Sequence, residues 1–302
     1  MAIEWKPGEP PGPGIYEGVP EHIYHSWRLA SNSALTKLKR SPAHLRASWE
    51  RPTDPTAAMR FGTAVHCAVL EPERFAALYA TAEQCGATTA KGERCANNGT
   101  ARYGGVWRCG RHPVKDVEPD ALELLPEDQI AACKAIRANL HAHPKLRKLL
   151  LAPGTTELSV VWDDAETGVR CKARIDRLCE IGGGIVLDLK TTSDARPFAF
   201  AKKIFEFGYY RQKAMYQDAL RAHGVDTEHL VFAAIENEAP YLVAGYRLSD
   251  GAADMGRAEL RVLLRRFARC MDADTWPGYD PDIQEISLPA YAWDAIEMEE
   301  AA

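Results

Sequence analysis

Residues 170–190 read RCKARIDRLCEIGGGIVLDLK, in which two strand-like segments flank three consecutive glycines. Side chains two apart on a strand share a face, so Asp188 and Lys190 point one way and the leucine between them points the other. A turn at the glycines makes the two segments a hairpin, which brings Asp176 to the head of the same site. Two acids and one lysine in one place favour a hard cation that binds oxygen and activates a water molecule.

An acid and a lysine two residues apart also occur on strands that face solvent, where they carry no function. In this sequence the pair interrupts an otherwise apolar strand of the kind that lies inside α/β domains. Buried charges are costly unless they are paired or bind a metal. The context therefore favours a functional site over a solvated sheet face.

The 302 residues are 46% hydrophobic and 26% charged, as is typical of a soluble globular protein. The sequence contains no apolar run long enough to span a membrane and no signal-peptide core near its N-terminus, so we expect a cytoplasmic protein. A net charge of -5 argues against a protein that coats nucleic acid by bulk charge. An enzyme that binds a few phosphates needs only a local basic lining.

Periodicity and turn residues predict an α/β fold in which helices flank a sheet. The last two of the predicted strands should form a second hairpin on that sheet, because a Pro-containing turn separates them. Helices are expected over residues 31–41, 59–79, 129–140, 198–222 and 252–271, with a short one opened by Pro144, and strands over 156–162, 169–181, 185–191, 230–236 and 242–248.

Residues 85–112 break this pattern, with six glycines, few aliphatic side chains, and Cys85, Cys95, Cys109 and His112. The spacing of the last two is that of one half of a tetrahedral zinc site. We therefore predict a structural Zn²⁺ knuckle, the alternative being a disordered loop with free thiols. Four ligands leave no open position, which favours a scaffold or a DNA guide over catalysis. The basic residues that would assist DNA guidance are Lys91, Arg94, Arg102, Arg108 and Arg111. The other five cysteines have no ligand spacing and are expected to be small buried hydrophobes.

Several short motifs follow one another along most of the chain outside this insertion. They are Gly14-Ile-Tyr16, Ser31-Asn-Ser33 with Ser41-Pro-Ala-His44, Gly62-Thr-Ala-Val-His66 with Leu70-Glu-Pro-Glu-Arg-Phe75, Glu157-Leu-Ser159, Lys172-Ala-Arg-Ile-Asp176, Asp188-Leu-Lys-Thr-Thr192, and Tyr210-Arg-Gln212-Lys-Ala-Met-Tyr216. In order and spacing they resemble the PD-(D/E)XK nucleases, specifically the RecE-like (exonuclease VIII) branch of the RecB-type exonucleases. The resemblance implies a restriction-endonuclease-like core with a mixed central sheet. Its parts would be a lead-in and helical part of the core (1–84), the knuckle (85–112), and a connector followed by the rest of the core (113–302).

The resemblance assigns roles to individual residues. Asp176 and Asp188 match the acidic ligands of Mg²⁺ or Mn²⁺, and the backbone carbonyl of Leu189 is a usual additional ligand. Lys190 matches the lysine that positions or deprotonates water and stabilises the developing phosphorane charge. His66 matches the histidine that completes the metal site, for which a core histidine on an apolar helix face is the alternative.

Three further matches are more ambiguous. Gln212 and Tyr216 lie four apart on one helix face and match a Gln-x-x-x-Tyr motif that would hold the phosphate strand or orient Lys190, although an aromatic residue at this spacing is often part of the core. Glu157 is expected to complete the metal site or to be a solvated acid at a strand end. Arg174 is expected to contact phosphate or to form a salt bridge.

The function implied by the resemblance is a divalent-metal-dependent DNA exonuclease. It would resect duplex ends from 5′ to 3′ and leave 3′ overhangs for recombination by a RecT-type single-strand annealing protein. A phage or prophage origin and a homo-oligomeric ring are also typical of such enzymes. Two alternatives stay open: a single-strand-specific exonuclease or endonuclease of a defence system, and a catalytically inactive DNA-binding or adaptor protein. The presence of every matched acid and of the lysine counts against the inactive protein.

Overall fold

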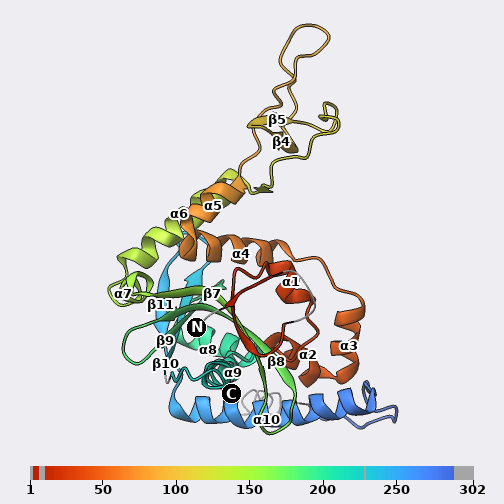
Figure 1. Cartoon of the computed structure of the whole chain (residues 1–302), viewed down its shortest axis with the longest axis vertical. Helices are drawn as coiled ribbons and strands as arrows, with labels where there is room; N and C mark the ends of the chain where they lie inside the picture. The colour runs from red at the N-terminus through yellow and green to blue at the C-terminus, as the bar shows by residue number, and fades with distance from the viewer. Residues whose placement is uncertain (1–2, 7–10, 228, 289–302) are drawn as a thin grey trace, which may run out of the picture.

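The structure, a computed structural model, describes residues 3–6, 11–227 and 229–288, and its centre is a seven-stranded mixed sheet (Figure 1). The strand order is β1-β2-β7-β8-β9-β10-β11. Strands β9 and β10 are parallel, whereas β7–β8, β8–β9 and β10–β11 are antiparallel pairs, so both predicted hairpins are confirmed. The strands are β1 (Ile3–Glu4), β2 (Gly14–Glu17), β7 (Gly154–Asp163), β8 (Arg170–Cys179), β9 (Ile185–Thr192), β10 (His229–Glu236) and β11 (Val243–Tyr246).

Helices cover both faces of this sheet, which confirms the α/β prediction (Figure 1). One face packs against α2, α8, α9 and α10, and the other against α4, α6 and α7. The helices are α1 (Glu21–Ser26), α2 (Asn32–Arg40), α3 (Pro42–Glu50), α4 (Ala57–Leu70), α5 (Pro72–Leu78), α6 (Glu127–Ala142), α7 (Leu146–Leu151), α8 (Pro197–Glu206), α9 (Tyr209–Arg221) and α10 (Asp250–Ala273).

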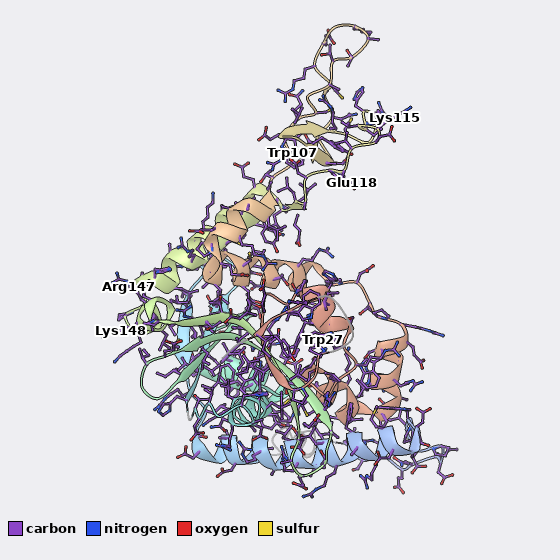
Figure 2. All side chains as sticks on the ribbon, in the orientation of Figure 1. Trp27, Trp107, Lys115, Glu118, Arg147 and Lys148 are labelled. Atoms are coloured by element: carbon purple, nitrogen blue, oxygen red, sulfur yellow. The ribbon has the colours of Figure 1, made fainter. Side chains whose placement is uncertain are left out.

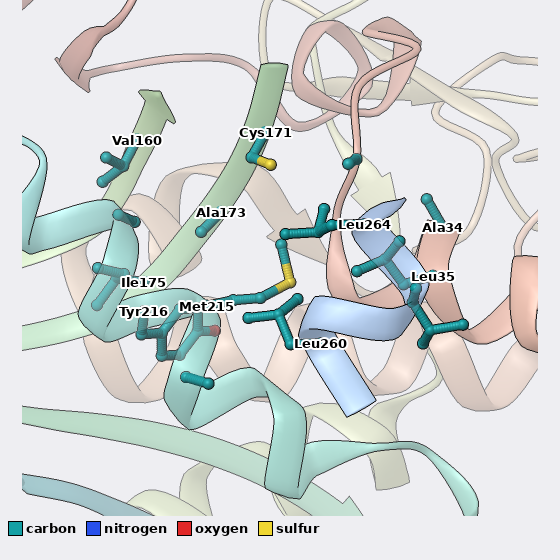
Figure 3. Close-up of a cluster of buried hydrophobic side chains, with 14 of the residues drawn as sticks. Ala34, Leu35, Val160, Cys171, Ala173, Ile175, Met215, Tyr216, Leu260 and Leu264 are labelled. Carbon is teal, nitrogen blue, oxygen red and sulfur yellow. The ribbon is translucent and has the colours of Figure 1, made fainter. Parts of the chain in front are cut away.

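The core between the sheet and α9 fixes the helix that carries Gln212 and Tyr216. Met215 and Tyr216 of α9 pack against the inward side chains of β7 and β8, and Leu264 of α10 closes the layer (Figure 3). All three side chains are at most 4% exposed. Burial of each such side chain contributes about 1.5–3 kcal/mol, so α9 cannot shift on the sheet without a large loss of stability.

Two predicted helices are each interrupted once. The helix expected over 59–79 ends at Leu70, and Pro72 begins α5, because proline cannot donate the hydrogen bond that a continuous helix requires. The helix expected over 198–222 breaks at Gly208, whose φ is +67° and where a Cβ atom would lie 2.1 Å from the Arg211 guanidinium. Apolar periodicity continues across both breaks, so it could not indicate them.

Residues 81–122 form an arm that projects from the rest of the chain (Figure 1). At its base β3 (Tyr79–Ala80) pairs with β6 (Glu123–Leu124), and within it β4 (Ala101–Tyr103) and β5 (Val106–Arg108) form a hairpin. Figure 2 shows Trp107 within the arm and Lys115 and Glu118 on it, away from Trp27 in the body. The arm contains the cysteine-rich insertion and contributes no strand to the seven-stranded sheet in the described residues.

Within the described ranges, none of the helices has both the length and the apolar composition needed to cross a membrane. The five cysteines outside the arm are all buried, as expected from their lack of ligand spacing. They are Cys67, Cys133, Cys171, Cys179 and Cys270.

Candidate active site

The site forms where β8 and β9 separate. The paired register of these strands runs from Cys179–Ile185 at the glycine turn to Arg177–Leu187. The next residue of β8 is Asp176, whose Oδ2 accepts a hydrogen bond from the backbone N–H of Leu189 at 2.7 Å. The carboxylate of Asp176 therefore takes the place of a backbone partner and is held between the separating strands. The backbone N–H of Leu189 thus has a defined partner in the structure. The predicted contact between the Leu189 carbonyl and a metal ion stays a prediction.

Glu157 on β7 lies opposite Asp176 and has an unusual backbone conformation. Regular pairing holds at Thr156–Arg177 and at Leu158–Ile175 but is interrupted between them, where Glu157 has φ +51°. The left-handed region costs a non-glycine residue about 1–2 kcal/mol, and such strain is concentrated at functional positions. The sequence carries no local signal for this conformation, because glutamate has no preference for it.

Three potential metal ligands meet at this point from three different elements. Donor atoms of His66 on α4, Glu157 on β7 and Asp176 on β8 all lie within 4.8 Å of one another. The Nδ1 atom of His66 is 3.5 Å from Oδ2 of Asp176. Two carboxylates and one imidazole form a donor set that suits Mg²⁺ or Mn²⁺, so these residues fit the ion that the sequence resemblance implies.

The two carboxylates of this group repel each other in a poorly solvated place. Burial raises the pKa of Glu157 to about 7, and the negative charge of Asp176 acts in the same direction. A bound cation would relieve this repulsion, since it stabilises the ionised form of both acids.

Asp188 and Lys190 share a face of β9, as the strand period predicts. The Asp188 side chain is 0% exposed, and its Oδ2 contacts the Lys190 ammonium. The amide of Gln212 donates to Asp188 Oδ1 at 3.0 Å, and the Tyr216 hydroxyl lies 2.9 Å from the same oxygen. The hydroxyl is also 2.9 Å from the carbonyl oxygen of Arg174, so its single proton serves one of two acceptors.

The ammonium of Lys190 stays charged at neutral pH. Burial disfavours the charged form, but the carboxylates of Asp188 and Asp176 outweigh it and raise the pKa of Lys190. The Lys190 Nζ also lies 4.6 Å from the centre of the Tyr209 ring, on the first turn of α9. A permanently charged ammonium in this position suits the stabilisation of negative charge better than the removal of a proton.

The positions of the other predicted residues narrow their roles. Gln212 and Tyr216 contact the Asp188 carboxylate and line the cleft, so the predicted contact with the phosphate strand stays a prediction. The guanidinium of Arg174 donates to the Val19 carbonyl and to Ser159 Oγ, and it is 3.8 Å from Glu157. Arg174 therefore forms the expected salt bridge and also lines the cleft, so its contact with phosphate stays a prediction.

These residues open into a cleft of about 720 Å³. Its lining includes His66, Glu157, Asp176 and Lys190 together with Tyr209, a residue that the sequence analysis did not single out. In the sequence, Tyr209 lies beside the Gln-x-x-x-Tyr motif in an aromatic-rich segment. This position is as typical of a buried helix face as of a functional site, so it did not identify Tyr209.

The four predicted zinc ligands also come together, in the arm. Donor atoms of Cys85, Cys95, Cys109 and His112 all lie within 4.8 Å of one another. The Sγ atoms of Cys95 and Cys109 are 3.9 Å apart, and Nδ1 of His112 is 3.4 Å from Cys109 Sγ and 3.8 Å from Cys85 Sγ. Sulfur ligands about 2.3 Å from a tetrahedral zinc ion lie about 3.8 Å apart, so these four side chains could hold a metal ion of this kind.

The separating strands with Asp176, Asp188 and Lys190, on a mixed sheet between helices, define the class of this chain as PD-(D/E)XK-like. Residues 31–286 match the family model described as "PDDEXK-like domain of unknown function (DUF3799)", and the chain belongs to this family. Comparison with the curated proteins gave no significant match.

Among solved structures, this chain is similar to a protein from Eubacterium rectale described as "Putative exonuclease". The two share 13% sequence identity at a TM-score of 0.54, over 92% of this chain and 98% of the other. A second structure, that of SSO0001, shares 13% identity over 44% of this chain and 56% of its own at a TM-score of 0.24, too low to support any argument. The first similarity supports the fold.

Proposed function

We propose that this protein is a divalent-metal-dependent deoxyribonuclease that hydrolyses phosphodiester bonds. The observation that carries the proposal is the meeting of His66, Glu157 and Asp176 beside the Asp188–Lys190 pair at one cleft. This arrangement places a donor set for a hard cation next to a fixed positive charge. Phosphodiester hydrolysis needs both, because negative charge develops on the phosphorus oxygens and the attacking water must be activated.

In this proposal His66, Glu157 and Asp176 hold the metal ion. When bound, the ion supplies Lewis-acid polarisation of a phosphoryl oxygen and lowers the pKa of a water molecule. The Lys190 ammonium stabilises the negative charge that develops on the phosphoryl oxygens. Asp188 holds Lys190 in place, and Gln212 and Tyr216 fix the orientation of Asp188. Whether Asp188 also ligates the metal stays a prediction, since its carboxylate here faces Lys190.

We infer from the RecE-like motifs that the enzyme resects duplex ends from 5′ to 3′. The description of the Eubacterium rectale protein as a "Putative exonuclease" agrees with removal of nucleotides from an end and carries no information on polarity. The product would be a 3′ overhang, which a RecT-type single-strand annealing protein can bind. A ring of several copies that encloses the DNA would keep the enzyme on its substrate.

The test is digestion of DNA labelled on one strand end at a time, with Mg²⁺ or Mn²⁺ and with EDTA. Linear, nicked and covalently closed circular duplexes are compared with single-stranded DNA. We expect metal-dependent release of the 5′ label from linear duplex, no cutting of the closed circle, and loss of cleavage in Asp176→Asn and Lys190→Ala. The matched control is Asp163→Asn, which removes an exposed acid of β7 paired with Arg170.

The outcomes separate the alternatives. Cutting of the closed circle would indicate an endonuclease, and digestion of single strands alone would indicate a single-strand-specific enzyme. A wild-type protein that binds duplex ends but never cuts them with either metal would contradict the proposal and favour an adaptor. Lys190→Ala should still bind Mn²⁺, since the ammonium does not contact the three metal donors.

We further propose that the arm holds one structural zinc ion through Cys85, Cys95, Cys109 and His112. The three cysteines are buried against each other and against Ala87, so this segment has little aliphatic core of its own. A segment of this kind needs a metal to keep its shape. Two of its basic side chains maintain the local structure: Arg94 donates to the Cys85 carbonyl and Arg102 pairs with Asp120.

Elemental analysis should find one zinc per chain in the wild type and none in Cys109→Ser, with Cys270→Ser as the control for an unrelated buried thiol. Proteolysis of the Cys109→Ser protein should begin within the arm, while the catalytic core still cleaves DNA. A folded, protease-resistant arm without zinc would refute the assignment.

A further inference from the structure

Helix α8 and the turn after it expose three aromatic rings, one of which lines the cleft. Phe198 is 75% exposed, Phe205 59% and Phe207 43%, within one stretch of ten residues. Single exposed apolar side chains are common on soluble proteins, but several large rings together indicate an interaction site. Phe207 belongs to the lining of the cleft, whereas Phe198 lies at the opposite end of α8.

A row of rings connects the catalytic lysine with this surface. The Lys190 ammonium lies 4.6 Å from the Tyr209 ring centre, and the Tyr209 ring stacks on Phe207 with centres 5.7 Å apart and planes at 24°. The ammonium of Lys203 lies 5.4 Å from the Phe207 ring centre. The row therefore begins at the Lys190 ammonium, which pairs with Asp188, and ends at the half-exposed Phe207 ring, which Lys203 contacts while its ammonium pairs with Glu206 at 3.2 Å.

The backbone holds this row in place. Gly208, with φ +67°, separates α8 from α9 and sets Phe207 and Tyr209 side by side. The carbonyl oxygen of Phe207 accepts a hydrogen bond from the Asn32 side chain of α2 at 3.3 Å. The backbone of Phe207 is thus held beside Tyr209, and the ring, which already stacks on Tyr209, loses little conformational entropy when a ligand binds.

We propose that Phe207 stacks against an unpaired base of the strand being cut, an inference that rests on the proposed nuclease function. Every base has a flat face that an aromatic side chain can stack on, which contributes about 1–3 kcal/mol per base. The Lys190 ammonium at the inner end of the row is the group that faces a phosphoryl oxygen in the proposed function. A base inside an intact duplex is already stacked on its neighbours, so the ring selects frayed or single-stranded ends.

The test is equilibrium binding in EDTA, where no DNA is cleaved. The probe is a duplex with a short unpaired 5′ end that carries 2-aminopurine, and the comparison is a blunt duplex whose end is cross-linked against fraying. Phe207→Ala should weaken binding of the unpaired end about 5- to 150-fold and abolish the fluorescence quenching caused by stacking, with little effect on the cross-linked duplex. Phe207→Trp should restore both signals, and Phe207→Leu should not.

Phe198→Ala is the matched control, because it removes a more exposed ring from the same helix away from the cleft. If the Phe207→Ala variant binds the unpaired end with an affinity within twofold of the wild type, this inference is overturned and the nuclease proposal is not. Full rescue by Phe207→Leu would have the same consequence. Equal losses in both alanine variants, with a wild-type dimer that dissociates in each, would assign the rings to self-association and overturn it too. A wild type that binds neither DNA, in EDTA or with Ca²⁺ in its place, would overturn the nuclease proposal and this inference with it.

Discussion

The buried pair of Asp188 and Lys190 allows a quantitative test of how the site is built. Asp188 is fully buried and the Lys190 side chain is 14% exposed, so neither charge is well solvated. Removing one partner leaves the other charge buried without compensation, which costs about 3–5 kcal/mol. We therefore expect Lys190→Met and Asp188→Asn each to lower the free energy of unfolding by this amount.

The double variant separates pairing from other effects. With both charges gone no uncompensated ion is left, and the side-chain oxygen of the asparagine introduced in place of Asp188 can still accept from Gln212 and Tyr216. The double variant should therefore be destabilised by much less than the sum of the singles, with a coupling free energy of about 2–3 kcal/mol. Its nuclease activity should nevertheless stay at least about 100-fold below that of the wild type, because the charge that stabilises the transition state is missing.

The assay is urea unfolding at pH 7 in EDTA, followed by tryptophan fluorescence. Asp163 and Arg170 provide the control pair: they join the two strands β7 and β8 but are 43% and 44% exposed. The coupling of that pair should be below about 1 kcal/mol. A coupling at Asp188–Lys190 no larger than at the control pair, or a double variant that cleaves DNA normally, would refute the reasoning.

Further predictions concern the support of the site and the pH dependence of stability. Tyr216→Phe removes a hydrogen bond to Asp188 and should lower kcat about tenfold with little change in KM, as measured by initial rates of label release. Gly208→Ala should lower the unfolding free energy by more than about 1 kcal/mol in urea titrations, because φ is +67° there and a Cβ would overlap Arg211. Burial lowers the pKa of Lys172 from 10.5 to about 7, with a smaller contribution from the charge of Arg174. The folded state then binds fewer protons than the unfolded chain between these values, so stability should rise by up to about 1.4 kcal/mol per pH unit from pH 7 to 10. This rise should be lost in Lys172→Met and kept in the exposed control Lys134→Met; an unchanged slope in Lys172→Met would contradict the assignment.

The features that the sequence specified are those set by short-range geometry. Strand alternation has a period of two, so the shared face of Asp188 and Lys190 followed from their spacing alone. The glycines at 182–184 all have positive φ and form the expected turn. The ligand spacing in the arm indicated which four side chains could meet, because all four lie within one short segment.

Other features depended on how distant segments pack, and no local pattern carries that information. Glu157 has a left-handed backbone where the pairing of β7 with β8 is interrupted. Asp176 lies between β8 and β9 where the pairing of these two strands ends. Both features therefore depend on how three strands pack together. The break at Gly208 and the ring row from Lys190 to Phe207 depend on α2 and α9 meeting at the cleft. The sequence by itself determined which groups were available and on which strand face they lay. Tertiary packing decided that His66, Glu157 and Asp176 meet at one point while Asp188 pairs with Lys190, because contacts between elements depend on the relative position of whole strands and helices.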